Sequence, residues 1–329
     1  MKEYWVLANK LLSIDYLEQS IDFKKKIFIA FSGGIDSSVL VHILGKNALK
    51  LNLDITVIHI NHNISPNSSN WTKHCKNFCN KLDLNFISEE VNIISSGGGL
   101  ESAARKERYN IFIKYLENDE QILTAHHMND VTETIFLRLL RGTGIDGLSG
   151  LKKSRKLGKG QLIRPFLEVP KKEIEEYAKE NDINYIFDES NEENEYDRNF
   201  LRNEIFPKLD ERWNDFSSRV FKMSKIANER NNNFLELLNN NYGYLISNVI
   251  KIKDLEHLNI DITKEIIRSS IKKENISTPN SKVLNEIIKT FIISNPSPKS
   301  IVSWSRADKD QQAGKITYDK GNIVISIQE

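Results

Sequence analysis

Short runs of consecutive apolar residues recur through the first half of the chain, with stretches of helical periodicity between them. The apolar runs predict strands at 27–31, 55–60, 84–91, 122–125 and, more weakly, 162–163. Apolar residues three and four positions apart predict helices over 37–49, 100–116 and 131–140. Continuous apolar strands that alternate with helices are typical of a parallel sheet with helices on both faces. The pattern therefore predicts a Rossmann-like α/β fold, in which ligands bind beyond the carboxyl ends of the strands.

The pattern changes after about residue 209. Amphipathic helices are predicted over 225–238, 263–271 and 282–293. Two short apolar runs on either side of a turn that contains Gly321 predict a terminal hairpin over 315–327. We therefore expect an α/β domain over 1–215 and a smaller, mostly helical domain over 216–329.

The composition is that of an ordinary globular protein, with 39% apolar residues, 28% charged residues and a net charge of +1. A net charge this small requires any basic surface for nucleic acid to be local. The two cysteines, Cys75 and Cys79, are too few for a disulfide scaffold or a metal site, so we expect free thiols in a reducing compartment. No apolar run approaches the ~20 residues of a membrane span, and the N-terminus lacks a signal-peptide core, so we expect a cytoplasmic protein.

A glycine-containing loop follows the first predicted strand and opens a helix, with the sequence Ser32-Gly33-Gly34-Ile35-Asp36-Ser37-Ser38. Glycines let the backbone approach phosphate oxygens, and free N–H groups at a helix start form an anion site. The loop has neither the lysine of the G-x-x-x-x-G-K-S/T pattern nor the G-x-G-x-x-G pattern. An ordinary strand-to-helix turn is the alternative interpretation of the glycines alone.

The carboxylate of Asp36 favours a nucleotide loop over an ordinary turn. An unscreened anion would repel a polyphosphate, so Asp36 makes sense as a ligand, direct or through water, of Mg²⁺ bound to ATP. The loop resembles the S-G-G-x-D-S loop of the PP-loop ATP pyrophosphatases. That resemblance implies an adenine nucleotide α-hydrolase-like domain, which cleaves ATP between the α- and β-phosphates and adenylates an acceptor oxygen.

Further segments narrow the resemblance. They lie at 60–63, 70–75, 99–109, 124–134, 141–148, 164–167, 188–191 and 196–199. In order and spacing they resemble the signature of tRNA(Ile)-lysidine synthetases over about 28–209. The resemblance implies a ligase that uses ATP to adenylate the C2 oxygen of the wobble cytidine in the CAU anticodon of tRNA(Ile). Free L-lysine then attacks C2 with its ε-amino group and expels AMP. The resemblance also implies a homodimer and a second domain that binds tRNA.

Several residues are candidates for the first step. Arg105 or Arg108 would neutralise charge on the α-phosphate together with Mg²⁺ at Asp36, although a solvated helix face would look the same. His126 and His127 follow a buried strand, so one would contact the phosphates or the nucleobase while the other packs. At the end of the second strand, where this fold receives adenine, the candidates are Asn61 and His62.

Asp130 and Glu133 are the candidates for holding the lysine substrate and accepting its proton. Acidic residues in a first helical turn also favour the helix dipole, which is the competing interpretation. Many family members carry two aspartates where this chain has Asn129-Asp130. Because an amide is no base, Asp130 carries the expectation and the role of Asn129 is left open.

Basic residues are the candidate contacts for lysine or tRNA phosphates, which would act through salt-sensitive attraction. They are Arg108, Arg141, Lys152, Lys153, Arg155, Arg198 and Arg202. The stretch 152–159 is expected to be a flexible, glycine-containing loop, and a solvated loop without a ligand would have the same composition.

Two other functions compete with the lysidine hypothesis. PP-loop thiolases of tRNA use cysteines, and here Cys75 and Cys79 are expected on a helix away from the strand ends, which argues against that class. Amidating PP-loop synthetases need delivered ammonia, and no glutaminase-like segment is visible. A nucleotide-binding RNA adaptor without catalysis is the alternative from another class, and the intact Asp36 and Asp130 disfavour it.

Overall fold

The computed structural model describes residues 11–63, 65–93, 100–305 and 312–328. These residues form two compact units. The first unit takes in the described residues of 1–94 and 104–229, and the second takes in those of 95–103 and 230–329. The division falls between Glu229 and Arg230, inside the long helix α11 (Phe216–Tyr242).

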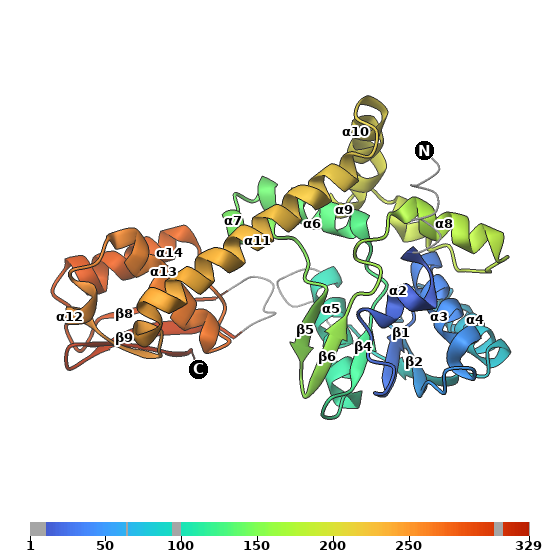
Figure 1. Ribbon diagram of the computed structural model, residues 1–329, viewed down its shortest axis with the longest axis horizontal. Helices are drawn as coiled ribbons and strands as arrows, with labels where there is room; N and C mark the ends of the chain where they lie inside the picture. The colour runs from blue at the N-terminus through green and yellow to red at the C-terminus, as the bar shows by residue number, and fades with distance from the viewer. Residues whose placement is uncertain (1–10, 64, 94–99, 306–311, 329) are drawn as a thin grey trace. The chain divides into compact units, whose positions relative to one another are not determined.

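A six-stranded sheet with the order β3-β2-β1-β4-β6-β5 forms the centre of the first unit (Figure 1). Its strands are β1 (Ile27–Ala30), β2 (Ile55–Asn61), β3 (Asn85–Glu90), β4 (Gln121–Leu123), β5 (Ser154–Leu157) and β6 (Gly160–Ile163). All neighbouring pairs are parallel except β5 and β6, which are antiparallel. The expected parallel α/β sheet is therefore confirmed, with an antiparallel edge strand added.

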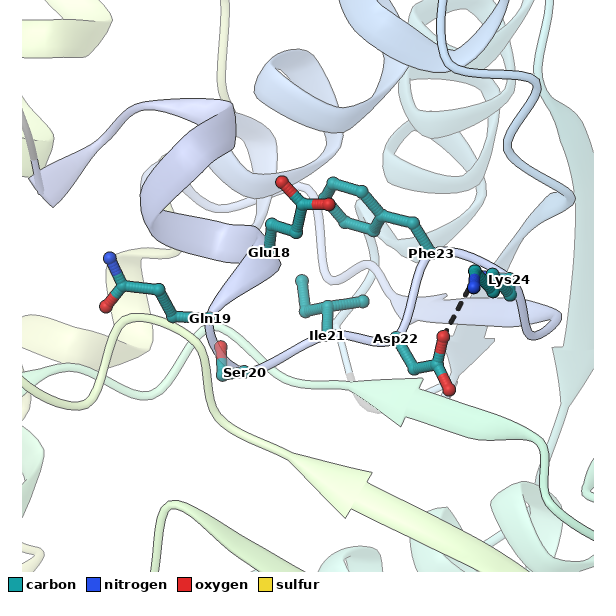
Figure 2. Close-up of a pocket in the computed structure, with 7 residues that line it drawn as sticks. All are labelled: Glu18, Gln19, Ser20, Ile21, Asp22, Phe23 and Lys24. Atoms are coloured by element: carbon teal, nitrogen blue, oxygen red, sulfur yellow. Dashed lines mark hydrogen bonds between the residues drawn. The ribbon is translucent and has the colours of Figure 1, made fainter.

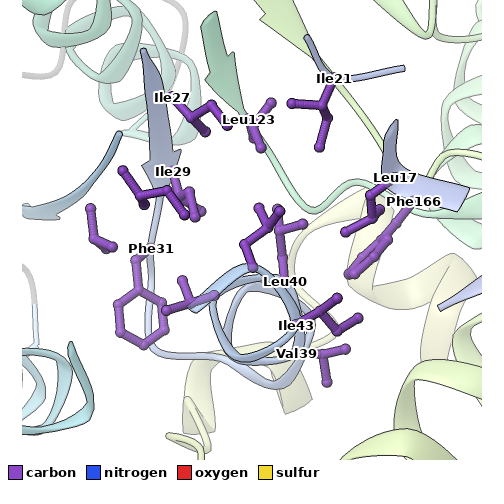
Figure 3. Packing of buried hydrophobic residues seen from close by; sticks show 14 of the residues in the cluster. Leu17, Ile21, Ile27, Ile29, Phe31, Val39, Leu40, Ile43, Leu123 and Phe166 are labelled. Carbon is purple, nitrogen blue, oxygen red and sulfur yellow. The ribbon is translucent and has the colours of Figure 1, made fainter. Parts of the chain in front are cut away.

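Helices cover both faces of this sheet because the buried strand residues alternate between two cores. Ile27 and Ile29 of β1 pack with Leu40 of α3 (Ile35–Ala48) in one core (Figure 3). On the other face Phe28 packs with Phe112 of α5 (Leu100–Tyr115). The same core as α3 takes in residues of α2 (Ile14–Glu18), α4 (Ser68–Lys81) and α8 (Lys171–Glu180).

The remaining helices of the first unit all come after β4 in the chain. They are α6 (Met128–Leu140), α7 (Ile145–Leu148), the 3-10 helix η1 (Glu189–Glu192), α9 (Asp197–Phe200), the π-helix η2 (Leu201–Ile205) and α10 (Phe206–Arg212). Phe136 of α6 packs edge-on against Phe206 of α10, with ring centroids 5.1 Å apart. This ring contact joins α6, which carries the acidic residues of the site, to the helix that directly follows Arg198 and Arg202 in the chain.

The expectation of a flexible loop over 152–159 is wrong. Ser154–Leu157 forms strand β5, which pairs with β6 through a tight turn at Gly158, whose φ is +55°. Glycine permits that left-handed conformation, so the residue expected to loosen the segment closes a hairpin instead. The charged side chains of this strand lie at the edge of the sheet, where they discourage pairing with another chain.

The second unit combines helices with a four-stranded antiparallel sheet of order β7-β10-β9-β8 (Figure 1). Its elements are η3 (Gly243–Leu245), β7 (Val249–Lys251), α12 (Ile252–Leu255), α13 (Ile260–Lys273), α14 (Ser281–Ile288), the π-helix η4 (Lys289–Ile293), β8 (Ile301–Trp304), β9 (Gly314–Asp319) and β10 (Asn322–Ile327). The terminal hairpin is confirmed by the pairing of β9 with β10. The sequence did not predict β7 or β8, because runs of three and four residues carry too little alternation.

No helix in the described part of the chain is long and apolar enough to cross a membrane.

Candidate active site

The phosphate loop lies where β1 ends and α3 begins, at the carboxyl edge of the parallel sheet. Gly33 has a φ of +88°, a conformation that side chains disfavour. The hydroxyl of Ser37 donates to the carbonyl of Gly34 at 3.0 Å and lies 3.0 Å from the hydroxyl of Ser32. Ser38 donates to the carbonyl of Gly33 at 3.2 Å. The serines therefore set the loop conformation from within, and Ile35 and Asp36 form the first turn of α3.

A second segment of chain holds the loop from outside. The N–H of Ile186 donates to the carbonyl of Gly33 at 2.8 Å, and a Cβ at Gly33 would overlap with the Ile186 side chain. The same Cβ would lie 3.0 Å from Sγ of Cys75. The expectation that Cys75 lies away from the strand ends is therefore wrong, since its thiol packs behind the loop. Burial raises the pKa of Cys75 to about 12, which keeps it a packed thiol.

The carboxylate of Asp36 has a basic partner that the sequence did not predict. Nζ of Lys171, the first residue of α8, lies 2.5 Å from Oδ1 of Asp36. The two side chains keep 27% and 30% of their surface exposed, so the pair faces solvent at the mouth of the loop. Nε2 of His127 lies 3.8 Å from the same oxygen. Asp36 is thus placed between a cationic residue and an imidazole beside the phosphate loop.

His127 and Asp130 stand at the start of α6, beyond the carboxyl end of β4. Oδ2 of Asp130 accepts a hydrogen bond from the backbone N–H of His127 at 2.8 Å and lies 3.6 Å from its Nε2. Burial alone would raise the pKa of Asp130, but His127, His126 and Arg202 outweigh burial and lower it to about 2. Asp130 is therefore an ionised carboxylate at neutral pH, and one histidine links it to Asp36.

Glu133 lies one turn further along α6 and is held by arginines. Nε and Nη2 of Arg202 donate to the two carboxylate oxygens at 2.7 and 3.0 Å. Nε of Arg198 lies 3.4 Å from Oε2. The Glu133 side chain is only 1% exposed, and burial raises its pKa while Arg202 opposes the shift. This geometry gives Glu133 the role of an anchor for Arg202, whose Nη2 lies 3.8 Å from Asp130.

A second basic cluster surrounds the ring of Tyr109 on α5. The guanidinium groups of Arg105 and Arg155 lie 5.0 and 4.8 Å from the ring centroid, and Nη2 of Arg105 donates to the hydroxyl at 3.1 Å. Arg164 follows β6, is 3% exposed and donates from Nη1 to the carbonyl of Lys152 at 2.7 Å. Burial alone would raise the pKa of Tyr109, yet Arg105, Arg164 and Arg155 together lower it.

His126 lies between the two clusters. Its Nδ1 is 2.9 Å from the hydroxyl of Thr124. Burial lowers the pKa of His126 to about 3; Asp130 opposes this shift, whereas Arg164, Arg105 and Arg108 reinforce it. The imidazole is therefore neutral at physiological pH and can donate or accept a hydrogen bond without charge. Burial and the nearby Arg108 likewise lower the pKa of His62 to about 4.

Other candidate residues lie outside these clusters. Arg141 is 72% exposed and lies 3.8 Å from the carboxylate of Asp197 at the surface. The ammonium of Lys153 lies over the ring of Tyr16 at 5.6 Å. Lys152 is exposed and contributes its backbone carbonyl to Arg164. Asn61 is 4% exposed, and its Oδ1 accepts the N–H of Asn63 at 2.9 Å, so its side chain supports a turn.

The acidic side chains of this site suit a magnesium ion that binds together with a nucleotide. Among the described residues there is no group of three or more His, Cys, Asp or Glu side chains that could hold a metal by themselves. Magnesium is commonly held by one or two carboxylates together with substrate phosphates and waters, so the single exposed carboxylate of Asp36 fits that role.

The hollow drawn in Figure 2 does not belong to this site. It has a volume of about 430 Å³ and is lined by Glu18–Lys24, which precede the amino end of β1. In that segment the backbone N–H of Asp22 donates to Oε1 of Gln121 at 2.9 Å. The segment thus secures the opposite end of the sheet from the phosphate loop.

Sequence reasoning missed Lys171, Arg164 and Tyr109 as members of the site. The signal for Lys171 was present, because Pro170 and Lys171 begin a helix soon after a strand, and the loop itself carries no lysine or arginine. Arg164 directly follows strand β6, as the phosphate loop follows strand β1, so its place at a strand end was a similar signal. Tyr109 could not be separated from an ordinary core residue, since only folding brings Arg155 to it.

Comparison with known proteins extends these observations. The family model of the PP-loop domain matches residues 9–209. The tRNA(Ile)-lysidine synthase of Legionella pneumophila (strain Paris) is 34% identical over 302 residues, which cover 91% of this chain and 69% of that protein. The synthase of Buchnera aphidicola subsp. Schizaphis graminum is 40% identical over 284 residues, covering 83% and 63% of the respective chains.

The solved structure of the U34-tRNA thiolase NcsA from Methanococcus maripaludis has a similar fold. It superposes with a TM-score of 0.53 and 15% identity over 69% of this chain and 78% of that one. At this identity the likeness concerns the fold alone. By its PP-loop domain and its extended similarity to curated relatives, this chain belongs to the tRNA(Ile)-lysidine synthase family.

Proposed function

We propose that this chain is a cytoplasmic tRNA(Ile)-lysidine synthetase that uses ATP, Mg²⁺ and free L-lysine. The observation that carries the proposal is the placement of two carboxylates around one histidine. Nε2 of His127 lies 3.8 Å from Asp36 on the phosphate loop and 3.6 Å from the ionised Asp130. The proposed polyphosphate site at Asp36 and the proposed ammonium site at Asp130 would therefore adjoin, as a reaction of ATP followed by lysine requires.

In the first step the C2 oxygen of the wobble cytidine attacks the α-phosphorus of ATP. The bond from that phosphorus to the oxygen bridging to the β-phosphate breaks, and its electron pair leaves with pyrophosphate. The loop N–H groups and the exposed Ser32 hydroxyl would orient the phosphates, while the Ser37 hydroxyl, which donates to Gly34, would hold the loop in shape. Magnesium bound through Asp36 would neutralise phosphate charge. Arg105, which donates to the Tyr109 hydroxyl, would stabilise the α-phosphate.

In the second step the ε-ammonium of lysine gives up a proton and the resulting amine attacks C2. The bond from C2 to the adenylated oxygen breaks and releases AMP, and the protons lost by the lysine nitrogen pass to water. Asp130 would attract the ammonium of the incoming lysine, because its carboxylate stays charged at neutral pH. A carboxyl with a pKa of about 2 is a weak base, so Asp130 serves as an anchor more than as a proton acceptor. Glu133 would act indirectly by holding Arg202 beside Asp130.

The exposed basic residues of strand β5 are the proposed contacts for tRNA phosphates. Arg155 and Lys156 are exposed along the free edge of the sheet. Such contacts would act by counterion release, so replacing Arg155 by alanine should reduce the salt dependence of tRNA affinity by about one counterion. The second unit is the proposed reader of tRNA features outside the anticodon. We also propose a homodimer, which light scattering of the purified chain tests.

Mass analysis of the wobble nucleoside tests the proposal. The chain is incubated with ATP, Mg²⁺, L-lysine and in-vitro transcribed tRNA(Ile) that carries CAU. The proposal expects cytidine-34 to gain one lysine with loss of one water. Gain of sulfur in the presence of a sulfur donor would favour the thiolase alternative. An unchanged base with ATP bound but no pyrophosphate released would favour an RNA adaptor.

A further inference from the structure

The phosphate loop carries no cationic side chain of its own. Residues 32–38 contain no lysine or arginine, although they are expected to face a polyphosphate with several negative charges. The structure brings a cation there from another helix, because Nζ of Lys171 lies 2.5 Å from Oδ1 of Asp36. The neighbouring Lys172 has 83% of its side chain exposed and pairs with Glu176 at 4.0 Å. Two consecutive lysines therefore have different environments, and one of them faces the loop.

The backbone around Lys171 is fixed to the start of α6. The N–H of Lys171 donates to Oδ1 of Asn129 at 3.1 Å, and the N–H of Met128 donates to the carbonyl of Val169 at 3.0 Å. Asn129 is thus the acceptor that satisfies the first N–H of helix α8. These two bonds hold the base of the Lys171 side chain, which stays 27% exposed. A lysine with a fixed base and a partly exposed side chain can exchange one anionic partner for another.

We propose that Lys171 is the phosphate-binding cation of this loop and that Asn129 is the residue that positions it. In the structure the ammonium is paired with Asp36. With nucleotide it contacts the β- and γ-phosphates, while the carboxylate of Asp36 becomes free to take a metal. Asp36 would then hold Mg²⁺, which would neutralise charge on the phosphates, and Lys171 contacts the same carboxylate oxygen. The inference rests on the proposed use of ATP at this loop, and it holds whichever base is adenylated.

Lys171 has a defined part in the first step. When the bond between the α-phosphorus and the bridging oxygen breaks, the electron pair stays on pyrophosphate. The ammonium of Lys171 offsets that added charge and keeps its own proton, so no proton transfer is required. A fixed cation at the leaving group is one of the recurring ways in which proteins stabilise phosphoryl-transfer transition states.

Equilibrium binding separates this role from a structural one. The ligands are α,β-methylene-ATP, which resists cleavage between the α- and β-phosphates, inorganic pyrophosphate and AMP, each with Mg²⁺. The variants are Lys171→Met, the charge-retaining Lys171→Arg and the matched control Lys172→Met, with thermal melts to confirm folding. If the methionine variant does not fold, Lys171→Gln takes its place.

The proposal expects Lys171→Met to weaken binding of the ATP analogue and of pyrophosphate by about 10- to 100-fold, as loss of a charge-assisted contact does. AMP affinity should stay unchanged, because AMP lacks the phosphates concerned. Lys171→Arg should recover most of the affinity, and Lys172→Met should bind like the original chain. Wild-type affinity of Lys171→Met for the ATP analogue, or equal losses for the analogue and AMP, would overturn the assignment.

The proposed role of Asn129 in positioning Lys171 is tested in the same binding assay. Asn129→Ala removes the acceptor of the Lys171 N–H. It should therefore weaken binding of the ATP analogue, by less than Lys171→Met does, and leave the affinity for AMP unchanged. Asn129→Asp keeps an acceptor oxygen and should restore binding of the analogue. Should Asn129→Ala bind the analogue normally, Asn129 does not position Lys171. If the original chain binds the ATP analogue and the variants behave as expected, but the original chain forms no lysidine, the proposed function is rejected and the Lys171 assignment stands.

Discussion

The carbonyl oxygen of Gly33 accepts a hydrogen bond from the N–H of Ile186 at 2.8 Å. The phosphate loop is therefore held by a segment that lies far from it in the sequence, after helix α8. Cys75 of α4 packs on the same glycine. Two separate elements thus fix the backbone that is expected to meet the phosphates, which makes the loop preorganised.

Replacing Gly33 by alanine should damage both stability and nucleotide binding. The residue has a φ of +88°, and a Cβ there would overlap with the side chain of Ile186. We expect a loss of about 1–3 kcal/mol in the free energy of unfolding, measured by urea denaturation. Gly34→Ala is the control for stability, since Gly34 has a φ of −71° and its nearest neighbour would lie 3.5 Å away. Equal stability of the two variants would contradict the packing described for Gly33.

Removing the carboxylate of Glu133 should destabilise the first unit. Glu133→Ala would leave Arg202 without the partner that accepts its two hydrogen bonds at 2.7 and 3.0 Å. Because Glu133 is buried while the Arg202 side chain keeps 39% of its surface exposed, water can hydrate part of the freed guanidinium, so we expect a loss of about 1–3 kcal/mol in the free energy of unfolding. Glu204→Ala, at an exposed pair with Lys208, should change stability by less than about 0.5 kcal/mol. A similarly small effect at Glu133 would show that the buried pair contributes little.

The pKa of His126 predicts a pH dependence of stability. The folded protein holds this pKa at about 3, below the ordinary value of 6.5, so between these values the unfolded chain binds the extra proton. Stability is therefore full above about pH 6.5 and falls as the pH drops toward 3. His126→Asn should show a smaller loss of unfolding free energy between pH 7 and pH 4.5. An NMR titration of the imidazole with a midpoint near 6.5 would refute the assignment.

The two cysteines should be chemically inert in the native protein. Burial raises the pKa values of Cys75 and Cys79 to about 12, so little reactive thiolate is present at pH 8. We expect slow alkylation by iodoacetamide in buffer and rapid alkylation in urea. A variant with alanine at both positions should retain ATP-dependent pyrophosphate release if it folds. If a folded double variant lost that activity, cysteine chemistry of the thiolase kind would have to be reconsidered.

Much of the first unit could be predicted from local sequence patterns. The apolar strands and the loop 32–38 follow from hydrophobic runs and from glycines at a strand end, which are local properties. The edge strand β5 was missed because charged residues obscure its pattern and only its pairing with β6 defines it. Its Gly158 marks a turn in the structure, whereas in the sequence it is equally compatible with a flexible loop.

The candidate site was predictable where its residues follow strands and not where it depends on tertiary contacts. Asp36, His127 and Asp130 were identified because they follow β1 and β4. Lys171 was missed because its approach to Asp36 depends on how α8 packs against α3. The arginine partners of Glu133 were separate candidates in the sequence, and only the fold shows that they bind this carboxylate.

The most direct test of the central claim is pyrophosphate release from ATP with Mg²⁺, L-lysine and tRNA(Ile) bearing CAU, measured while one component at a time is omitted. The account predicts release that requires this tRNA, stops in Asp36→Ala, and is followed by lysine addition to the wobble cytidine. Pyrophosphate release that proceeds equally well without the tRNA, or that survives in Asp36→Ala, would contradict it.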